Sequence, residues 1–165
     1  MSNLPYRPCV GIMVINPDGL VWTGQRADMA GYAEGPGQWW QMPQGGIDDG
    51  EDPQVAAMRE VWEETAIRSL EVLGETSDWL TYALPPELLG IAWGGRFGGQ
   101  KQKWFAMRFT GDETEIDIGP RDGHDIEFRA WRWSRLDELV PGIVPFKRDV
   151  YEKVVAELGQ FVRPV

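Results

Sequence analysis

The sequence contains almost no cysteine or histidine, and this shortage excludes several classes of site. Cys9 is its single cysteine and His124 its single histidine. One thiol cannot form an intramolecular disulfide, and one thiol with one imidazole cannot build a thiolate or imidazole metal cluster. A bound metal ion therefore needs oxygen ligands. Neither residue is assigned a role, because a lone cysteine in an apolar strand and a lone histidine in an acidic loop are unremarkable.

Basic residues and long apolar runs are also scarce. The net charge is −10 and the isoelectric point is near 4.6, which argues against a broad surface that coats nucleic acid, because phosphate binding requires clustered Lys and Arg. A local basic cleft is compatible with this charge. The N-terminal segment MSNLPYRPCV lacks the apolar core of a signal peptide, and no apolar run is long enough to cross a bilayer. The sequence thus predicts a cytoplasmic protein without a membrane partner.

The residues that are present predict one globular domain spanning residues 1–165. Hydrophobic residues make up 42% and charged residues 25% of the chain, values that argue against disorder. Nine tryptophans indicate an aromatic core, with some rings left for stacking on a planar ligand. We expect Trp39, Trp40, Trp104, Trp131 and Trp133 to pack mainly in the core or on a sheet.

Alternating and apolar segments predict a sheet, and two periodic segments predict helices. The expected strands span residues 9–15, 20–26, 101–110 and 126–134. The turn NPDG joins the first two in a hairpin, residues 27–38 form a surface loop, and residues 39–46 form a short strand that runs into a glycine turn. Helices are expected over residues 53–66 and 147–162, the first beginning at Pro53. Strands interrupted by two helices predict an α/β or α+β sandwich with a mixed sheet.

Acidic residues concentrate in the segment GGIDDGEDPQVAAMREVWEETAI, residues 45–67. At about 100° per residue, Glu60, Glu63 and Glu64 share one face of the predicted helix. The opposite face, which we expect to pack on the sheet, carries Val55, Met58, Val61 and Trp62. Three carboxylates on one face are either a solvated acidic surface or ligands of a cation. Like-charge pairs cost only about 0.2–0.5 kcal/mol each, which is too little to decide between the two.

The residues around these glutamates favour a cation. Gly45 and Gly46 permit a close backbone approach that leaves a carbonyl for a ligand role. Arg59 is placed to orient Glu63 or Glu51. Oxygen ligands without Cys or His are typical of Mg²⁺, Mn²⁺ or Ca²⁺, and the segment lacks the alternating ligands of a calcium loop. Because Mg²⁺ binds few protein groups and shares phosphate oxygens with its substrate, we expect a ligand that contains phosphate.

The acidic segment resembles the Nudix box, the signature of the Nudix hydrolases. The matching positions are Gly45, Glu51, Arg59, Glu60, Val61, Glu63, Glu64 and Ile67. One position departs, because Ala66 stands where the box has a glycine that serves the end of the helix. The segments YRPCVGIMVIN, WWQMPQGGID, GQKQKWFAMRF, EFRAWRW and PFKRDVY are similar to the bacterial branch that contains RNA pyrophosphohydrolase and diadenosine polyphosphate hydrolase. The resemblance covers most of the chain and implies the Nudix α/β/α sandwich, with a central mixed sheet between helices.

The resemblance also implies residues for catalysis. The expected metal ligands are the Gly45 carbonyl and the carboxylates of Glu60, Glu63, Glu64 and Glu127. Glu60, Glu64 and Glu127 are the expected catalytic carboxylates, with Glu64 or Glu127 as the general base. For Glu127 the alternative is a surface carboxylate at the start of a strand. Glu51 and Arg59 are expected to support the ligands, and the implied cofactor is several Mg²⁺ ions, for which Mn²⁺ can substitute.

Substrate contacts are implied by matches to other positions of the same branch. Arg7, Arg26, Lys103 and Lys147 are expected to face phosphates, Tyr82 and Gln100 to line the cleft, and Phe146 to stack on a nucleobase. Stacking of this kind contributes about 1–3 kcal/mol per base. Each basic residue alone is also compatible with a solvated charge, and Phe146 alone with a core position.

The implied activity leaves three alternatives open. The segments GQKQKWF and FKRDVY favour RNA with a 5′-triphosphate as substrate, from which pyrophosphate is removed. A dinucleoside polyphosphate such as diadenosine tetraphosphate is the alternative, because the loop over residues 27–38 is longer than in some members that cleave RNA. A non-catalytic nucleotide-binding module is less favoured, because such modules commonly lose a box carboxylate and this chain keeps all of them. No protein partner follows from the sequence.

Overall fold

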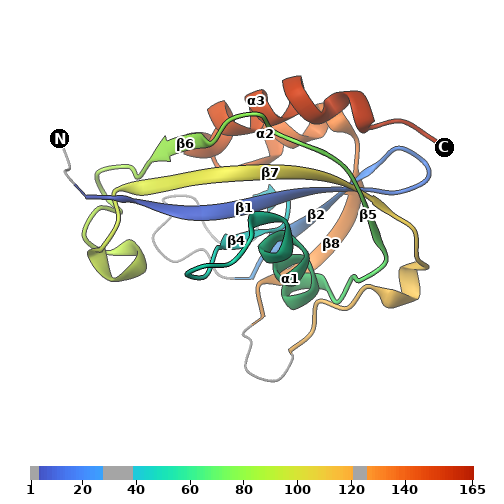
Figure 1. Cartoon of the computed structure of the whole chain (residues 1–165), viewed down its shortest axis with the longest axis horizontal. Helices are drawn as coiled ribbons and strands as arrows, with labels where there is room; N and C mark the ends of the chain where they lie inside the picture. Colours follow the sequence, from blue (N-terminus) through green and yellow to red (C-terminus); the bar gives the residue numbers. More distant parts are fainter. Residues whose placement is uncertain (1–3, 28–38, 121–125) are drawn as a thin grey trace.

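The computed structural model of the chain describes residues 4–27, 39–120 and 126–165. Within these residues, strands form one sheet at the centre of the molecule, and helices lie on both of its faces (Figure 1). The predicted α/β/α sandwich is thereby confirmed. The loop expected over residues 27–38 lies, apart from its first residue, outside the described residues, as does His124. The assignment of residues 1–165 to a single domain stays a prediction.

The sheet of the described residues has eight strands. They are β1 (Tyr6–Ile15), β2 (Val21–Arg26), β3 (Trp40–Gln41), β4 (Gln44–Gly46), β5 (Leu70–Glu75), β6 (Leu80–Ala83), β7 (Gly99–Phe109) and β8 (Phe128–Ser134). β1 and β7 run parallel, with Tyr6 opposite Gly99 and Ile15 opposite Arg108. β2 and β4 pair antiparallel with β1, β3 and β8 with β2, and β5 and β6 with β7. The predicted mixed sheet and the hairpin of β1 and β2 are confirmed.

The α-helices of the described residues are α1 (Pro53–Thr65), α2 (Leu139–Gly142) and α3 (Arg148–Leu158). α1 and α3 confirm the two predicted helices, whereas α2 is not predicted by the sequence. Asp52 caps α1, because its carboxylate accepts hydrogen bonds from the backbone N–H groups of Gln54 and Val55. In Figure 1, α1 lies on one face of the sheet, and α2 and α3 lie on the other. No helix among the described residues combines the length and apolar character needed to cross a membrane.

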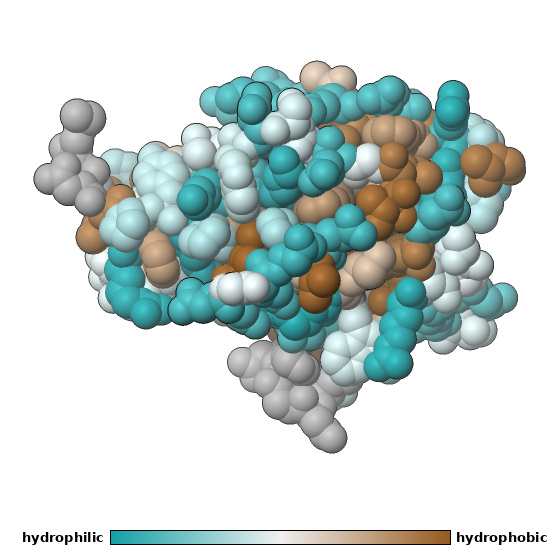
Figure 2. Space-filling view, in the orientation of Figure 1, coloured by the Kyte–Doolittle hydropathy of each residue, from teal (hydrophilic) through white to brown (hydrophobic). Residues whose placement is uncertain are grey.

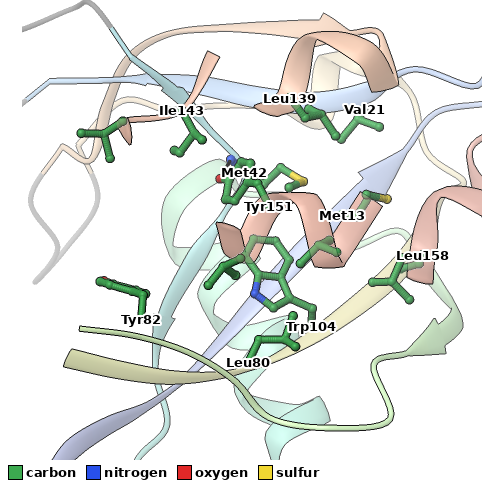
Figure 3. Close-up of a cluster of buried hydrophobic side chains, with 14 of the residues drawn as sticks. Met13, Val21, Met42, Leu80, Tyr82, Trp104, Leu139, Ile143, Tyr151 and Leu158 are labelled. Atoms are coloured by element: carbon green, nitrogen blue, oxygen red, sulfur yellow. Dashed lines mark hydrogen bonds between the residues drawn. The ribbon is translucent and has the colours of Figure 1, made fainter. Parts of the chain in front are cut away.

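The sheet divides the hydrophobic core into two clusters. The cluster on the α3 side includes Met13, Val21, Met42, Leu80, Trp104, Leu139, Tyr151 and Leu158 (Figure 3). The cluster on the α1 side includes Val10, Ile12, Trp22, Val61, Phe105, Met107 and Phe128. Alternation along β1 and β7 sends neighbouring side chains into different clusters. Trp104 of β7 is fully buried, as expected. Its indole ring packs against Gly11 of β1, and a Cβ at Gly11 would collide with the ring.

The predicted glycine turn is wrong, because Gly45 and Gly46 lie in β4 and pair with Val10 and Cys9 of β1. The close approach that these glycines permit is nevertheless present. A Cβ at Gly45 would collide with the carboxylate of Glu60. A Cβ at Gly46 would lie 2.5 Å from the guanidinium of Arg7. Because these two glycines have no side chain, Glu60 of α1 and Arg7 of β1 can lie directly against β4.

The packing face of α1 differs from the predicted one. Val55 is 58% exposed and Met58 is 37% exposed, although both were expected to face the sheet. The buried residues of α1 are Ala56, Ala57, Val61, Glu64 and Thr65. Glu64, which was expected on the face opposite to the packing residues, is thus buried with them. Figure 2, in the orientation of Figure 1, shows hydrophobic residues among hydrophilic ones over the region of α1.

Candidate active site

One cavity of about 470 Å³ brings most of the predicted site residues together. The predicted residues that line it are Arg7, Arg26, Gly45, Glu60, Glu64, Tyr82, Gln100, Glu127, Phe146 and Lys147. Gly46, which the sequence indicated as a point of close backbone approach, also lines it, and the lining residues that sequence reasoning did not identify are Gln44, Leu84, Leu88, Ala92 and Trp93. Glu51, Arg59, Glu63 and Lys103 do not line the cavity. The cavity therefore joins two groups of residues. The acidic group comes from α1 and from Glu127, which directly precedes β8. The basic and aromatic group comes from β1, β2, β6 and the segment before α3.

The acidic group centres on Glu60 and Glu64, which are four residues apart and therefore one helical turn apart on α1. Burial, followed by the nearby carboxylate of Glu63, raises the pKa of Glu60 to about 7. Burial also raises the pKa of Glu64 well above its usual range, and the carboxylates of Glu127 and Glu60 add to this effect. The Glu64 side chain is buried, and its Oε2 has no hydrogen-bond partner among the described residues.

Arg59 organises the carboxylates around this group. Its Nε and Nη2 donate hydrogen bonds of 2.9 Å and 2.8 Å to the two carboxylate oxygens of Glu51. Its Nη1 lies 2.9 Å from Oε1 of Glu60 and 3.2 Å from Oε2 of Glu63. Its Nη2 also donates to the carbonyl of Gly46 at 2.9 Å. The sequence left open whether Arg59 orients Glu51 or Glu63, and the structure shows contacts with both.

The fit of this group to a divalent cation rests on its unpaired oxygen and on its charge. As the side chains stand, no three His, Cys, Asp or Glu residues of the described chain converge on one point at ligand distances. Arg59 accounts for part of this, because its Nη1 engages Glu60 and Glu63 at once. The buried carboxylate of Glu64, whose Oε2 has no donor, and the partly buried carboxylate of Glu60 both have raised pKa values, and a cation stabilises such groups. The residues present fit such an ion, and the individual ligands stay predictions.

The basic and aromatic group centres on Lys147 and Phe146. Lys147 is only 4% exposed, and burial, followed by the positive charge of Arg26, lowers its pKa to about 8. Its ammonium lies 5.8 Å from the ring of Tyr82 and 5.9 Å from the ring of Phe146. These two rings are 5.7 Å apart. At the junction with the acidic group, Nη1 of Arg26 lies 3.6 Å from Oε1 of Glu127.

Arg7 reaches the cavity from β1 and lies on an aromatic ring. Its guanidinium carbon is 5.6 Å from the ring centroid of Trp93. Trp93 has a left-handed backbone, with φ 52°, and the following Gly94 has φ 67°. The glycine-rich run IAWGGRFGGQ is the sequence signal for this tight turn. That signal reveals a turn but does not reveal that the turn places an indole ring in the site.

Lys103 and Glu63 are the predicted site residues that the fold directs elsewhere. Side chains alternate along β7, so Lys103 faces the side of the sheet opposite to Gln100. Its Nζ is 3.9 Å from Oε2 of Glu75 and 3.5 Å from the carbonyl of Ser77. Glu63 is held by Arg59 outside the cavity lining. Their roles toward phosphate and metal stay predictions.

Comparison with known proteins agrees with this geometry. The model of the NUDIX domain matches residues 5–154. The chain belongs to the Nudix family. The family predicted from the box and from the flanking segments is thereby confirmed. Nudix hydrolases generally need divalent metal ions, typically Mg²⁺, which agrees with the unpaired buried oxygen of Glu64.

Curated relatives extend the comparison over the length of this Nudix protein. A protein of Agrobacterium fabrum named RNA pyrophosphohydrolase is 57% identical over 158 residues, which cover 94% of this chain and 93% of the relative. A protein of Rhizobium meliloti with the same name is 55% identical over 164 residues and 98% of each chain. The family and these relatives indicate that this Nudix protein is a pyrophosphohydrolase.

Solved structures confirm the fold. An Ap4A hydrolase of C. elegans in a binary complex has a TM-score of 0.62 and 19% identity, over 94% of this chain and 99% of that chain. The dihydroneopterin triphosphate pyrophosphohydrolase of E. coli has a TM-score of 0.66 and 20% identity, over 92% of this chain and 98% of that chain. At these identities the likeness shows the Nudix fold alone.

Proposed function

We propose that this Nudix protein removes pyrophosphate from the 5′-triphosphate end of RNA. The observation that carries the proposal is the cavity, which places carboxylates of α1 and Glu127 next to Arg7, Lys147 and the ring of Phe146. A polyphosphate needs cations around its oxygens, and a nucleobase needs an aromatic surface. The name shared by relatives at 55–57% identity supports RNA as the substrate.

The reaction is a hydrolysis of a phosphoanhydride. The oxygen of a water molecule bonds to phosphorus, the bond from phosphorus to the bridging oxygen breaks, and pyrophosphate leaves from an RNA that retains a 5′-monophosphate. Mg²⁺ held by Glu60, Glu64 and the carbonyl of Gly45 would neutralise phosphate charge and lower the pKa of water. Glu64 or Glu127 accepts the proton of the attacking water. The cytoplasmic location expected from the sequence belongs to the same proposal.

The remaining lining residues bind the substrate. Arg7, Arg26 and Lys147 contact the phosphates, because each carries positive charge at the wall of the cavity. Phe146 stacks on a base next to the phosphates, and Tyr82 packs against Phe146 and supports its ring. The low pKa of Lys147 is expected to rise when a polyphosphate enters, since an anion favours the charged ammonium.

The test is a panel of substrates with Mg²⁺ and without it. We expect pyrophosphate from a 5′-triphosphorylated oligonucleotide, detected by chromatography, and no product when Mg²⁺ is removed. The Glu64→Gln variant serves as the inactive control. Products from diadenosine tetraphosphate alone would replace RNA with a dinucleoside polyphosphate as the substrate. Binding of these compounds without any product would identify a non-catalytic nucleotide-binding module.

A further inference from the structure

A chain of side-chain amides lies beneath the cavity. The indole Nε1 of Trp104 donates a hydrogen bond of 2.8 Å to Oε1 of Gln102. The Nε2 of Gln102 donates to Oε1 of Gln100 at 2.6 Å and to Oε1 of Gln44 at 3.0 Å. Gln100 and Gln102 are each 2% exposed. Figure 3 shows the Trp104 indole inside the core on the α3 side of the sheet.

The chemistry of the indole fixes the direction of every amide in this chain. An indole N–H donates a hydrogen bond and never accepts one. Gln102 therefore turns its oxygen toward Trp104 and its NH₂ group toward Gln44 and Gln100. The oxygens of Gln44 and Gln100 are in turn occupied by that NH₂ group. Only one orientation of each amide satisfies all three bonds.

The groups that remain are the NH₂ groups of Gln44 and Gln100. Both residues line the cavity, and the bonds within this chain use their oxygens and not their Nε2 atoms. Gln100 lies opposite Tyr82 on β6 and opposite Arg7 on β1, so its position is between the aromatic group and a guanidinium. Gln44 precedes Gly45 on β4. The floor of the cavity thus presents two neutral donors.

Donors at this place match the chemistry of a polyphosphate. Phosphate oxygens accept hydrogen bonds and do not donate them, and a hydrogen bond to a charged group is stronger than one between neutral groups. If either amide were reversed, its oxygen would face the phosphate oxygens and repel them. The direction set at Trp104 therefore decides whether the floor of the cavity attracts or repels the substrate.

We propose that Trp104 and Gln102 are positioning residues that orient the amides of Gln44 and Gln100 to donate hydrogen bonds to substrate phosphate oxygens. This inference rests on the proposed function only for its substrate class, a polyphosphate. It adds Gln44 to the binding residues. The fully buried Trp104 thereby has a role in addition to core packing, because its N–H group orients Gln102.

The first experiment removes the polar groups of the relay and keeps side chains of related shape in their place. In Gln102→Met a side chain of similar length replaces the amide, and in Trp104→Phe an aromatic ring remains without its N–H. We expect each variant to raise KM for a 5′-triphosphorylated oligonucleotide about tenfold, the scale of one hydrogen bond to a charged group. The value of kcat should change little, because the lost bonds act in both the bound substrate and the transition state. Thermal unfolding of each variant reports any loss of stability separately.

The second experiment is a double-mutant cycle with a matched control. Gln100→Met alone should also raise KM about tenfold. In the double variant Gln100→Met with Gln102→Met, KM should rise by less than the product of the two single effects, because both changes remove the same donor. The control is Gln41→Met. Gln41 is another buried glutamine whose Nε2 has no partner, but it lies in β3 and does not line the cavity, so KM should stay unchanged.

Calorimetric binding of a nucleoside triphosphate with a methylene bridge in place of the α–β oxygen tests the relay without turnover. The proposal is supported if the Kd rises in Gln102→Met and Gln100→Met but not in Gln41→Met. It is overturned if Gln102→Met lowers the unfolding temperature and leaves KM and Kd unchanged, since Gln102 is then a core residue only. If the wild-type protein cleaves another polyphosphate and not RNA, the proposed substrate is wrong, and KM for that polyphosphate tests the relay. If the wild-type protein neither binds the analogue nor cleaves any polyphosphate, both proposals are wrong.

Discussion

Arg59 binds Glu51 through two parallel hydrogen bonds, one from Nε and one from Nη2, at 2.9 Å and 2.8 Å. The remaining Nη1 contacts Glu60 and Glu63. One planar guanidinium thus links the start of α1 to the carboxylates in its middle, a geometry that the point charge of a lysine cannot reproduce. The carboxylates of Glu51, Glu60 and Glu63 are therefore positioned by Arg59, although Arg59 does not itself line the cavity.

The stability that Glu51 contributes should depend on pH. Hydrogen bonds from Arg59 and from the backbone of Asp48 lower its pKa from 4.5 to about 2. A carboxyl group whose pKa is lower in the folded state stabilises the fold above its unfolded pKa, and this contribution is lost as the pH falls through the folded value. We expect Glu51→Gln to reduce the free energy of unfolding by about 1–2 kcal/mol near neutral pH, and the difference should shrink progressively as the pH falls from 4.5 to about 2.

Urea unfolding of both proteins across this pH range measures the difference. The exposed pair of Arg135 and Asp137, 2.6 Å apart, provides the control, and Asp137→Asn should change stability by less than about 0.5 kcal/mol. If Glu51→Gln changed the stability by the same amount at neutral and at acid pH, the lowered pKa of Glu51 would be contradicted.

Glu64→Gln should separate activity from stability. Turnover should fall by at least about a hundredfold, because the variant loses a charged group that serves in ion binding or proton transfer. Without divalent ions the variant should unfold at a higher temperature at neutral pH. The reason is that burial raises the pKa of Glu64, so ionisation of this group opposes folding above its unfolded pKa.

Mg²⁺ should reverse this order of stability. An ion at a hundred times its Kd stabilises the folded wild type by about 2.7 kcal/mol, and the gain should be much smaller in Glu64→Gln. Thermal unfolding with and without Mg²⁺ measures both effects. Glu152→Gln, an exposed carboxylate on α3, should respond to Mg²⁺ as the wild type does. Equal Mg²⁺ stabilisation of wild type and Glu64→Gln would exclude Glu64 from the ion site.

Ala66→Gly should stabilise the protein. Ala66 occupies the box glycine position with φ 65° and ψ 4°, and its N–H donates to the carbonyl of Trp62. The helix exit that the usual glycine serves is therefore present, although an alanine must adopt the left-handed conformation, at a cost of about 1–2 kcal/mol. Glycine removes this cost but gains entropy in the unfolded chain, so we expect a net gain of about 0.5–1 kcal/mol.

The same substitution inside a helix provides the control for Ala66→Gly. Ala156 is an exposed residue of α3, and Ala156→Gly should destabilise the protein by about 1 kcal/mol. Denaturant unfolding of the two variants should therefore give effects of opposite sign. Destabilisation by both would show that the strain at Ala66 is compensated elsewhere.

Trp93→Ala should weaken substrate binding through Arg7. The guanidinium lies over the Trp93 ring, and this contact contributes about 0.5–1 kcal/mol at a partly exposed site. Its loss should raise KM about three- to fivefold with little change in kcat. Trp79 provides the control, because Lys101 lies 5.3 Å from its ring in a similar contact outside the cavity. KM is measured for both variants. If Trp79→Ala raised KM as much as Trp93→Ala, the effect of Trp93→Ala would not be due to its contact with Arg7.

The sequence by itself determined the local features of this protein. The spacing of the box places Arg59 within reach of Glu63, the capping position of Asp52 and the run of helix formers define α1, and apolar alternation defines β1, β7 and β8. These features depend on residues that are near one another in the chain, so period and propensity predict them. The family followed from the same spacing.

The resemblance predicted most of the residues that line the cavity, but only the tertiary structure showed the remaining ones and the contacts among them. Gln102 bonds to Gln44 across 58 positions of the chain, and no periodic pattern carries such a contact. The same holds for the indole of Trp93, for the exclusion of Lys103, and for β5 and β6, which pair with β7 at the edge of the sheet.

Burial was also decided in three dimensions. Glu64 is buried in α1, a helix that lies so close to the sheet that a Cβ at Gly45 would collide with the carboxylate of Glu60. A helical wheel places Glu64 beside Glu60 and Glu63, but it contains no information on how close the neighbouring element comes. The raised pKa and the unpaired oxygen of Glu64 follow from that approach, because removal of water around a carboxylate depends on residues distant in the chain.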